Sequence, residues 1–289
     1  MTCFFVSDLH GSESRYLALF EKIREERPRA LFLGGDILPS AITAVASPGA
    51  GHRDFINDFL VTELMKLYGQ LGEDYPRVFL ILGNDDGRFV EAAVYDAAVR
   101  GVWEYVHDRH VRFDKYQVYG YAYVPPSPFQ LKDWERYDVS RYVDPGCVSP
   151  EEGYMSVPVS TYERKHATIA RDLDRLADNA DLSNAIFLFH SPPYKSNLDR
   201  AALDGKMIDH VPLDVHVGSM AIKKFVAARQ PLLTLHGHVH ESTRLTGEWR
   251  DKIGQTVALS AAYDGKELAL IRFDPEAPEQ AARELIHNL

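Results

Sequence analysis

The sequence LHGHVHE, from Leu235 to Glu241, begins at the last residue of the apolar run PLLTL and places three histidines within five residues. Histidine is costly to bury unless it has a hydrogen-bond partner or a metal ion. A histidine cluster at the end of a strand-like apolar run therefore indicates a metal site at one edge of a sheet.

The same pattern, an apolar run that ends abruptly in polar residues, occurs four more times along the chain. The runs are CFFV before Ser7-Asp8, ALFL before Gly34-Gly35-Asp36, VFLIL before Gly83-Asn84 and AIFLF before His190. Runs of this length fit buried strands, and the segments between them have the apolar spacing of helices. Alternating strands and helices predict an α/β fold.

Two β-rich stretches interrupt this alternation, one at residues 111–124 and one at residues 254–274. In the second stretch, Asp264-Gly265 lies between two strand-like runs, which is typical of a hairpin turn. We expect antiparallel strands in both stretches, and hence a mixed sheet or a pair of sheets. The whole chain, residues 1–289, is interpreted as a single domain.

Two long segments without a clear strand or helix pattern cover residues 125–160 and 191–218. Connections of this length in a compact domain are usually functional or disordered. We expect both to border the functional site, where the rings of Trp134 and Tyr194 bind the organic part of a substrate. The alternative is that both loops are peripheral.

The composition describes a globular protein with an acidic balance. Hydrophobic residues make up 45% of the sequence, enough for a large core, and 32 Lys and Arg against 42 Asp and Glu give a net charge of −10. This charge disfavours nucleic acid and anionic membranes as partners, although a local basic patch stays open. The sequence has only two cysteines and no recognisable signal peptide, so we expect a cytoplasmic protein. It also has no apolar run of ~18 residues, so we expect no membrane span.

The polar residues that end the five apolar runs form one candidate site. The carboxyl ends of parallel strands meet at one edge of a sheet, so residues far apart in the sequence converge there. Carboxylates, imidazoles and an amide oxygen suit a pair of transition metal ions such as Mn, Fe or Zn. Gly237 is expected to turn the backbone tightly so that His238 and His240 face different ions.

Taken in order, these motifs resemble the calcineurin-like metallophosphoesterases over roughly residues 2 to 273. The matching motifs are Asp8-x-His10, Gly35-Asp36, Gly83-Asn84, His190 and Gly237-His238-x-His240. The resemblance implies a four-layer fold, a mixed β-sandwich flanked by helices on both sides. It also implies that Asp8, His10 and His240 hold one ion, that Asn84, His190 and His238 hold the other, and that Asp36 bridges both.

One position departs from the family pattern. The family usually has a histidine and then an acidic residue after Gly-Asn, whereas this chain reads Gly83-Asn84-Asp85-Asp86. A carboxylate at Asp85 repels a phosphate unless it is protonated, metal-bound or turned away. Asp85, Asp86 and His216 are the candidate catalytic residues.

Two of the histidines outside the shared motifs lie near the candidate site in the sequence. His236 is interpreted as a hydrogen-bonded residue at a strand end, which is favoured over a role as a ligand. His216 either faces the site or simply precedes a helix for which Ser219 is a plausible N-cap.

The leading functional hypothesis is a dinuclear metal-dependent phosphoesterase in which a metal-bridging hydroxide attacks the phosphorus of a small phosphate ester. Phosphodiesters are preferred over monoesters because Asp85 replaces the usual proton-donating histidine. The alternatives are a phosphomonoesterase, a protein phosphatase or a nuclease of the same superfamily. A metal-binding scaffold without activity is the competing class, and bound metal together with hydrolysis of an activated diester would separate it from the enzymes.

Overall fold

Two six-stranded mixed sheets form the centre of the protein in the computed structural model, which describes residues 1–41 and 54–287. The first sheet has the order β14-β13-β1-β2-β3-β4 and the second β11-β12-β10-β7-β6-β5. The strands of the first are β1 Cys3–Val6, β2 Ala30–Gly34, β3 Arg77–Ile81, β4 Glu104–Tyr105, β13 Leu268–Phe273 and β14 Ala282–Ile286. Those of the second are β5 Arg109–Phe113, β6 Tyr116–Tyr121, β7 Ala185–Phe189, β10 Leu233–His236, β11 Arg250–Ile253 and β12 Thr256–Ser260.

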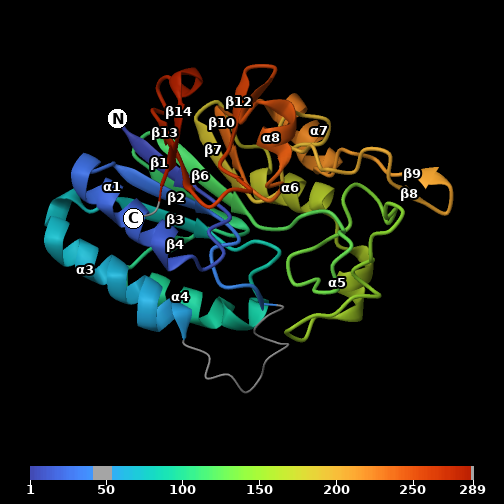
Figure 1. Ribbon diagram of the computed structural model, residues 1–289, viewed down its shortest axis with the longest axis horizontal. Helices are drawn as coiled ribbons and strands as arrows, with labels where there is room; N and C mark the ends of the chain where they lie inside the picture. The colour runs from blue at the N-terminus through green and yellow to red at the C-terminus, as the bar shows by residue number, and fades with distance from the viewer. Residues whose placement is uncertain (42–53, 288–289) are drawn as a thin grey trace.

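Helices cover the outer faces of the two sheets, which gives the four layers that were predicted (Figure 1). On the side of the first sheet lie α1 Glu13–Glu26, the π-helix η1 Phe55–Val61, α3 Thr62–Leu71 and α4 Glu91–Val99, and on the side of the second lie α6 Ile169–Ala177 and α7 Met220–Arg229. The rings of Phe79 in β3 and Phe113 in β5 meet between the sheets at 5.4 Å, and Phe225 of α7 packs on Phe187 of β7 at 5.2 Å.

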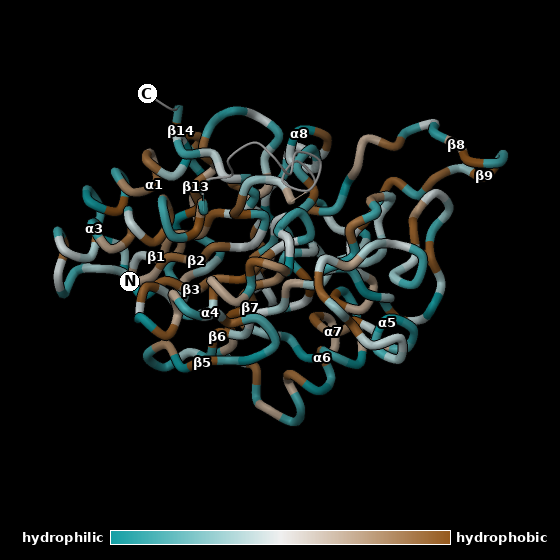
Figure 2. The backbone as a smooth tube through the Cα atoms, turned by 90° about the horizontal axis from the view of Figure 1, so that it is seen from below, coloured by the Kyte–Doolittle hydropathy of each residue, from teal (hydrophilic) through white to brown (hydrophobic). Residues whose placement is uncertain are grey.

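The apolar runs form strands because the fold covers both of their faces. Every residue of β1, β2 and β7 is buried, and Figure 2 shows the hydrophobic colouring of the chain in these central strands. Parallel strands buried on both faces have continuous rather than alternating apolar residues. In register, Phe5 of β1 lies opposite Phe32 of β2, and Phe32 lies opposite Phe79 of β3. The aromatic residues therefore cross the sheet as one layer of the core.

The hairpin predicted at Asp264-Gly265 is wrong. The strand before it, β12, pairs with β10 and β11, whereas the strand after it, β13, pairs with β1 and β14. The segment thus crosses from one sheet to the other. Pairing with a buried neighbouring strand outweighed the local turn preference, since strand pairing depends mainly on tertiary context. The prediction of antiparallel strands in both stretches is confirmed, because β5 pairs with β6 in the first, and in the second β12 pairs with β11 and β13 pairs with β1 and β14.

The two long loops lie on the same side of the molecule (Figure 1). The first leads into the short helix α5 Thr161–His166, and the second contains the hairpin of β8 Met207–Ile208 and β9 Val211–Pro212. Asp138 of the first loop accepts hydrogen bonds from Ser219 Oγ at 2.6 Å and from Met220 N at 2.7 Å, at the start of α7. Ser219 is the N-cap of α7, as predicted.

Membrane-crossing helices are absent from residues 1–41 and 54–287, where no helix has the length and apolar character that a bilayer requires. The remaining short helical elements are η2 Gly72–Asp74, η3 Arg88–Val90, α8 Ser242–Thr246 and η4 Pro278–Gln280.

Candidate metal centre

The carboxyl ends of five parallel strands bring together the strand-end cluster, a name used here for seven side chains: Asp8, His10, Asp36, Asn84, His190, His238 and His240. The first sheet supplies Asp8, His10, Asp36 and Asn84 after β1, β2 and β3, and the second supplies the other three after β7 and β10. A hydrogen bond joins the contributions of the two sheets, because the backbone N–H of His238 donates to the side-chain Oδ1 of Asp8 at 3.0 Å. The site therefore lies where both sheets end.

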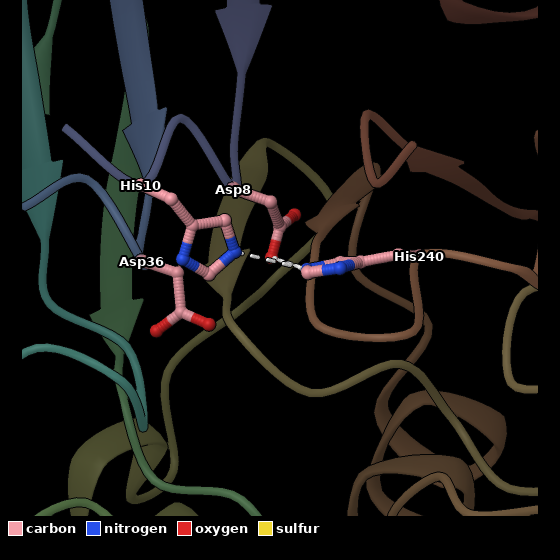
Figure 3. Close-up of side chains that lie close together, drawn as sticks. All are labelled: Asp8, His10, Asp36 and His240. Carbon is pink, nitrogen blue, oxygen red and sulfur yellow. Dashed lines mark hydrogen bonds and ion pairs between the residues drawn. The ribbon is translucent and has the colours of Figure 1, made fainter. Parts of the chain in front are cut away.

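One half of the cluster consists of Asp8, His10, Asp36 and His240, whose ligand atoms all lie within 4.8 Å of one another (Figure 3). His240 Nε2 is 3.2 Å from His10 Nε2 and 3.2 Å from Asp8 Oδ1. Two imidazole nitrogens and a carboxylate oxygen thus converge from two loops, one after β1 and one after β10. This donor set fits a transition metal ion.

Asp85 orients His10 within this half. Asp85 Oδ2 is 3.2 Å from His10 Nδ1, and Asp85 Oδ1 accepts a hydrogen bond from Ser40 Oγ at 2.7 Å. A carboxylate that holds Nδ1–H leaves Nε2 as the ligand atom, which is the usual arrangement around a metal-bound histidine. The sequence left the role of Asp85 open, and the structure turns its carboxylate toward His10.

The other half is built around His190, which is completely buried. Its Nδ1 lies 2.9 Å from the carbonyl oxygen of Gly34 and must donate there, because a carbonyl oxygen can only accept. Its Nε2 then faces Asn84 Oδ1 at 3.1 Å and Asp36 Oδ2 at 3.3 Å. The ring of His238 lies 5.2 Å from that of His190. Asp36 therefore has a carboxylate oxygen in reach of both halves.

The charges of the cluster favour a bound cation. Burial opposes ionisation of Asp8, yet its hydrogen bond with His240 and the other histidines keep the pKa of Asp8 well below its ordinary value. Burial likewise lowers the pKa of His190, but the charge of Asp36 and its hydrogen bond raise that pKa to about 9. Buried carboxylates thus draw protons onto the histidines, and a metal ion would supply the same positive charge.

Burial, followed by the charge of His190, lowers the pKa of His238 to about 3. This ring is neutral at pH 7 and keeps a lone pair for a ligand, which is the form in which histidine binds metals.

The backbone of the cluster is strained. Asp8, His10, Asp36 and His238 have φ angles of 56°, 46°, 50° and 77°, in the left-handed region that few residues other than glycine adopt. Such conformations cost roughly 1–3 kcal/mol each and concentrate at functional sites. Four strained residues in one cluster support a functional rather than a structural role for it.

The motif glycines provide space for the cluster. A Cβ atom on Gly35 would lie 2.6 Å from His190 Nδ1, one on Gly83 would lie 2.7 Å from His190 Cε1, and one on Gly237 would lie 2.7 Å from Asp8 Oδ2. The expectation that Gly237 makes the tight turn is corrected, because the left-handed residue is His238. Gly237 is required by its close approach to Asp8.

Comparison with known proteins assigns the family. The model of the calcineurin-like phosphoesterases matches residues 1–242, a range that contains the whole strand-end cluster. The chain belongs to the calcineurin-like phosphoesterase family. The predicted membership and fold class are thereby confirmed. No curated protein matches the chain significantly.

Two of the similar solved structures support this fold. One is 16% identical, with 99% of each chain covered and a TM-score of 0.59. Another, the protein TT1561 of Thermus thermophilus, is 15% identical with 99% of each chain covered and a TM-score of 0.54. A dimetal phosphatase from Danio rerio is 12% identical over 94% of this chain and 91% of its own, with a TM-score of 0.49. At these identities the first two similarities concern the fold alone.

His236 is separate from the cluster, as the favoured interpretation had it. Its Nδ1 lies 2.9 Å from the carbonyl oxygen of Ser191, and its Nε2 lies 2.8 Å from Thr234 Oγ1. Both ring nitrogens of this buried residue have partners, and burial lowers its pKa to about 4. His236 is a neutral hydrogen-bonded core residue at the end of β10.

Asp86 has a structural role in this calcineurin-like phosphoesterase, which corrects its place among the catalytic candidates. Its side chain is fully buried and accepts hydrogen bonds from the backbone N–H groups of Leu38 at 2.8 Å, Gly83 at 2.9 Å and Ile37 at 3.2 Å. These bonds join the loop after β2 to the loop after β3. Asp86 thus positions the segments that carry Asp36 and Asn84 but has no surface for a substrate.

Trp134 is also corrected as a substrate-binding residue. Its side chain is 0% exposed and packs with the ring of His107 at 4.9 Å, inside the core beneath the first long loop. A large apolar ring stabilises the fold more when it is buried in the core than when it is exposed at the substrate site. The position of Trp134 in the sequence does not show which of these two places the ring occupies. Tyr194, the other predicted residue, does line the cavity described below, and so does Tyr142.

His216 lines the same cavity as the cluster and forms a pair with Asp199 that the sequence analysis missed. His216 Nδ1 lies 2.8 Å from Asp199 Oδ1, and Asp199 is completely buried. The backbone N–H groups of Lys195, Ser196 and Gly218 also donate to the Asp199 carboxylate. No sequence motif marks this pair, because its members are brought together only by the loop.

Proposed function

We propose that this member of the calcineurin-like phosphoesterases hydrolyses small phosphate esters with two transition metal ions bound at the strand-end cluster. The observation that carries the proposal is that ligand atoms meet at two places in the cluster. In one half these atoms are His10 Nε2, His240 Nε2 and Asp8 Oδ1. In the other half they are His190 Nε2 and Asn84 Oδ1. Asp36 is the residue within reach of both. Mn, Fe and Zn suit these ligands.

The residues of the cluster have distinct roles in this proposal. Asp8, His10 and His240 would hold one ion, Asn84, His190 and His238 the other, and Asp36 both. When bound, the ions polarise the phosphoryl oxygen and lower the pKa of a water molecule so that it can attack phosphorus. Asp85 keeps Nε2 of His10 available by holding Nδ1, and the carbonyl oxygen of Gly34 does the same for His190.

His216 is our candidate for the proton donor in place of the missing histidine at position 85. As the water oxygen bonds to phosphorus, the bond to the leaving oxygen breaks and that oxygen takes a proton from His216 Nε2. The water releases a proton in return, which restores the imidazole. Asp199 holds Nδ1 of His216 and so directs Nε2 away from itself. A buried carboxylate behind a histidine is a common support for acid–base catalysis.

Phosphodiesters fit the site better than monoesters. The cluster already contains the carboxylates of Asp8 and Asp36, and Asp85 lies beside His10. Asp8 and Asp36 would be neutralised by the bound ions, but Asp85 holds no ion in this proposal, and a monoester dianion brings one more negative charge toward it than a diester does. The net charge of −10 also disfavours a long polyanion such as nucleic acid.

The test is reconstitution. Purified protein is stripped of metal with a chelator, reloaded with Mn, Fe or Zn, and assayed with bis(4-nitrophenyl) phosphate and with 4-nitrophenyl phosphate. We expect the stripped protein to be inactive, at least one metal to restore hydrolysis, and the diester to have the higher kcat/KM. Hydrolysis that is insensitive to metal removal, or absent with every metal, would contradict the proposal.

Gly83→Ala is expected to reduce both metal content and activity. Its Cβ atom would lie against Asp36 and His190, so the two halves of the cluster cannot keep their present spacing. Elemental analysis should find less metal per chain, and kcat/KM should fall by ~10- to 100-fold or more, as when the support of a metal ligand is lost.

Gly69→Ala is the matched control, because Gly69 lies in α3 and a Cβ atom there meets nothing within 4 Å. Alanine in a helix is favoured over glycine by about 1 kcal/mol, so this variant should be at least as stable as the wild type with unchanged metal content. Equal metal content in both variants would show that Gly83 is not needed for the cluster.

A further inference from the structure

A cavity of about 830 Å³ opens beside the strand-end cluster. His10, Asp36, Asn84, His238 and His240 line it together with residues of both long loops. The prediction that these loops border the site is confirmed, and the alternative that they are peripheral is excluded. A volume of this size accommodates a ligand far larger than a phosphate group, since ligand pockets typically measure ~300–1,000 Å³.

The walls of the cavity that the loops supply are mainly apolar. They include Pro125, Pro128 and Phe129 of the first loop, and Leu203, Ile208 and Leu213 of the second. Such surfaces favour hydrocarbon or aromatic groups by removing them from water.

The charged groups of these walls are acidic. Asp138, Asp144, Asp214 and Glu241 line the cavity, whereas no lysine or arginine of residues 1–41 and 54–287 does so. Partial burial, followed by the charge of Asp214, raises the pKa of Asp144. A second anionic group on a ligand would therefore meet repulsion without a compensating cation.

Contacts between the two loops hold the walls in place. Asp138 binds the start of α7, as described above, and a Cβ atom on Gly146 would collide with the side chain of Ile208 in β8. The second loop is fixed in turn to the segment after His240, since Arg200 N donates to Ser242 Oγ at 3.0 Å and Ala202 N donates to Glu241 Oε1 at 3.1 Å. These contacts fix the walls of the cavity to the rest of the fold.

We infer that the cavity binds the organic group of the substrate, and that this group is bulky, apolar and free of negative charge apart from the phosphate itself. This inference rests on the proposed function for the position of the phosphate. It names the substrate class as phosphodiesters of long-chain or aromatic alcohols, and it excludes nucleoside diphosphates and triphosphates, sugar phosphates with several phosphates, and polyphosphates. The loop walls supply the selectivity, and the strand-end cluster supplies the chemistry.

The test compares ligands that differ only in their organic group. Methylphosphonate, hexylphosphonate and 5-carboxypentylphosphonate are titrated into Mn-loaded and into metal-free protein by calorimetry. We expect hexylphosphonate to bind at least about tenfold more tightly than methylphosphonate, because its methylene groups leave water. We expect 5-carboxypentylphosphonate to bind at least about tenfold more weakly than hexylphosphonate.

Two arginine variants locate the selectivity. Leu213→Arg places a cation on the cavity wall and is expected to improve the affinity for 5-carboxypentylphosphonate relative to hexylphosphonate by about tenfold or more. Val211→Arg, two residues away on an exposed strand that does not line the cavity, should leave this ratio within about twofold, as expected for a screened surface charge.

Two results would overturn the inference. The first is that hexylphosphonate binds no more tightly than methylphosphonate, in either the Mn-loaded or the metal-free protein. The second is that the affinity for 5-carboxypentylphosphonate relative to hexylphosphonate is the same in Leu213→Arg as in Val211→Arg. Failure of the proposed function would instead appear as the absence of metal-dependent hydrolysis in the reconstitution assay. The calorimetric ranking does not depend on turnover, so the two failures are distinguishable.

Discussion

Asp36→Asn is expected to abolish hydrolysis and to remove metal from both halves of the strand-end cluster at once. Asp36 is the residue with ligand atoms in reach of both halves, since its carboxylate belongs to the group around Asp8, His10 and His240 and also lies 3.3 Å from His190 Nε2. A neutral amide bridges two dications poorly. The loss in kcat/KM should exceed the ~10- to 100-fold that follows the loss of an outer-sphere partner.

Asp172→Asn is the matched control for this variant. Asp172 is also a buried carboxylate, and it forms an ion pair with Arg136 at 2.7 Å, but it lies in α6 away from the cluster. Breaking a buried pair destabilises the fold, so the melting temperature should fall while metal per folded chain stays at the wild-type value. If Asp36→Asn retained two metal ions per chain by elemental analysis, the bridging role would be wrong.

His216→Ala is expected to slow the hydrolysis of esters with basic leaving alcohols by ~10²–10⁴-fold, the usual contribution of general acid catalysis. Diesters with 4-nitrophenolate as the leaving group need little protonation and should react nearly as fast as with the wild type. The measurement is the dependence of log kcat/KM on leaving-group pKa, which should become steeper. Asp199→Asn should give an intermediate slope because the imidazole loses its orienting carboxylate.

A second histidine in the loop of His216 provides the control for His216→Ala. His210 lies in the turn between β8 and β9 and does not line the cavity, and asparagine tolerates its left-handed φ of 67°. His210→Asn should keep the wild-type slope. An unchanged slope in His216→Ala would contradict the role of His216 as proton donor, and a uniform loss across all leaving groups would assign it to positioning instead.

Much of the fold was predictable because its information is local. Each of the five apolar runs became a parallel strand, since only strands covered on both faces tolerate continuous burial. The residues that follow them converge because the carboxyl ends of parallel strands share one edge. The order of Asp8, His10, Asp36, Asn84 and the later histidines therefore indicated both the fold and the position of the site.

The remaining features depend on contacts that the sequence pattern does not contain. Asp264-Gly265 has hairpin chemistry, but the strands on either side had stronger partners in two different sheets. Trp134 lies in a loop segment yet fills the core, and Asp199 acquires its role only where the loop folds back on His216. Tertiary packing decided each of these cases over local preference.

Anomalous X-ray scattering from crystals grown with Mn²⁺ tests the central claim most directly. The account predicts two anomalous peaks at the carboxyl ends of the sheets, one held by Asp8, His10 and His240, the other by Asn84, His190 and His238, with the Asp36 carboxylate bonded to both. A single peak, or two peaks with Asp36 bonded to neither, would contradict it.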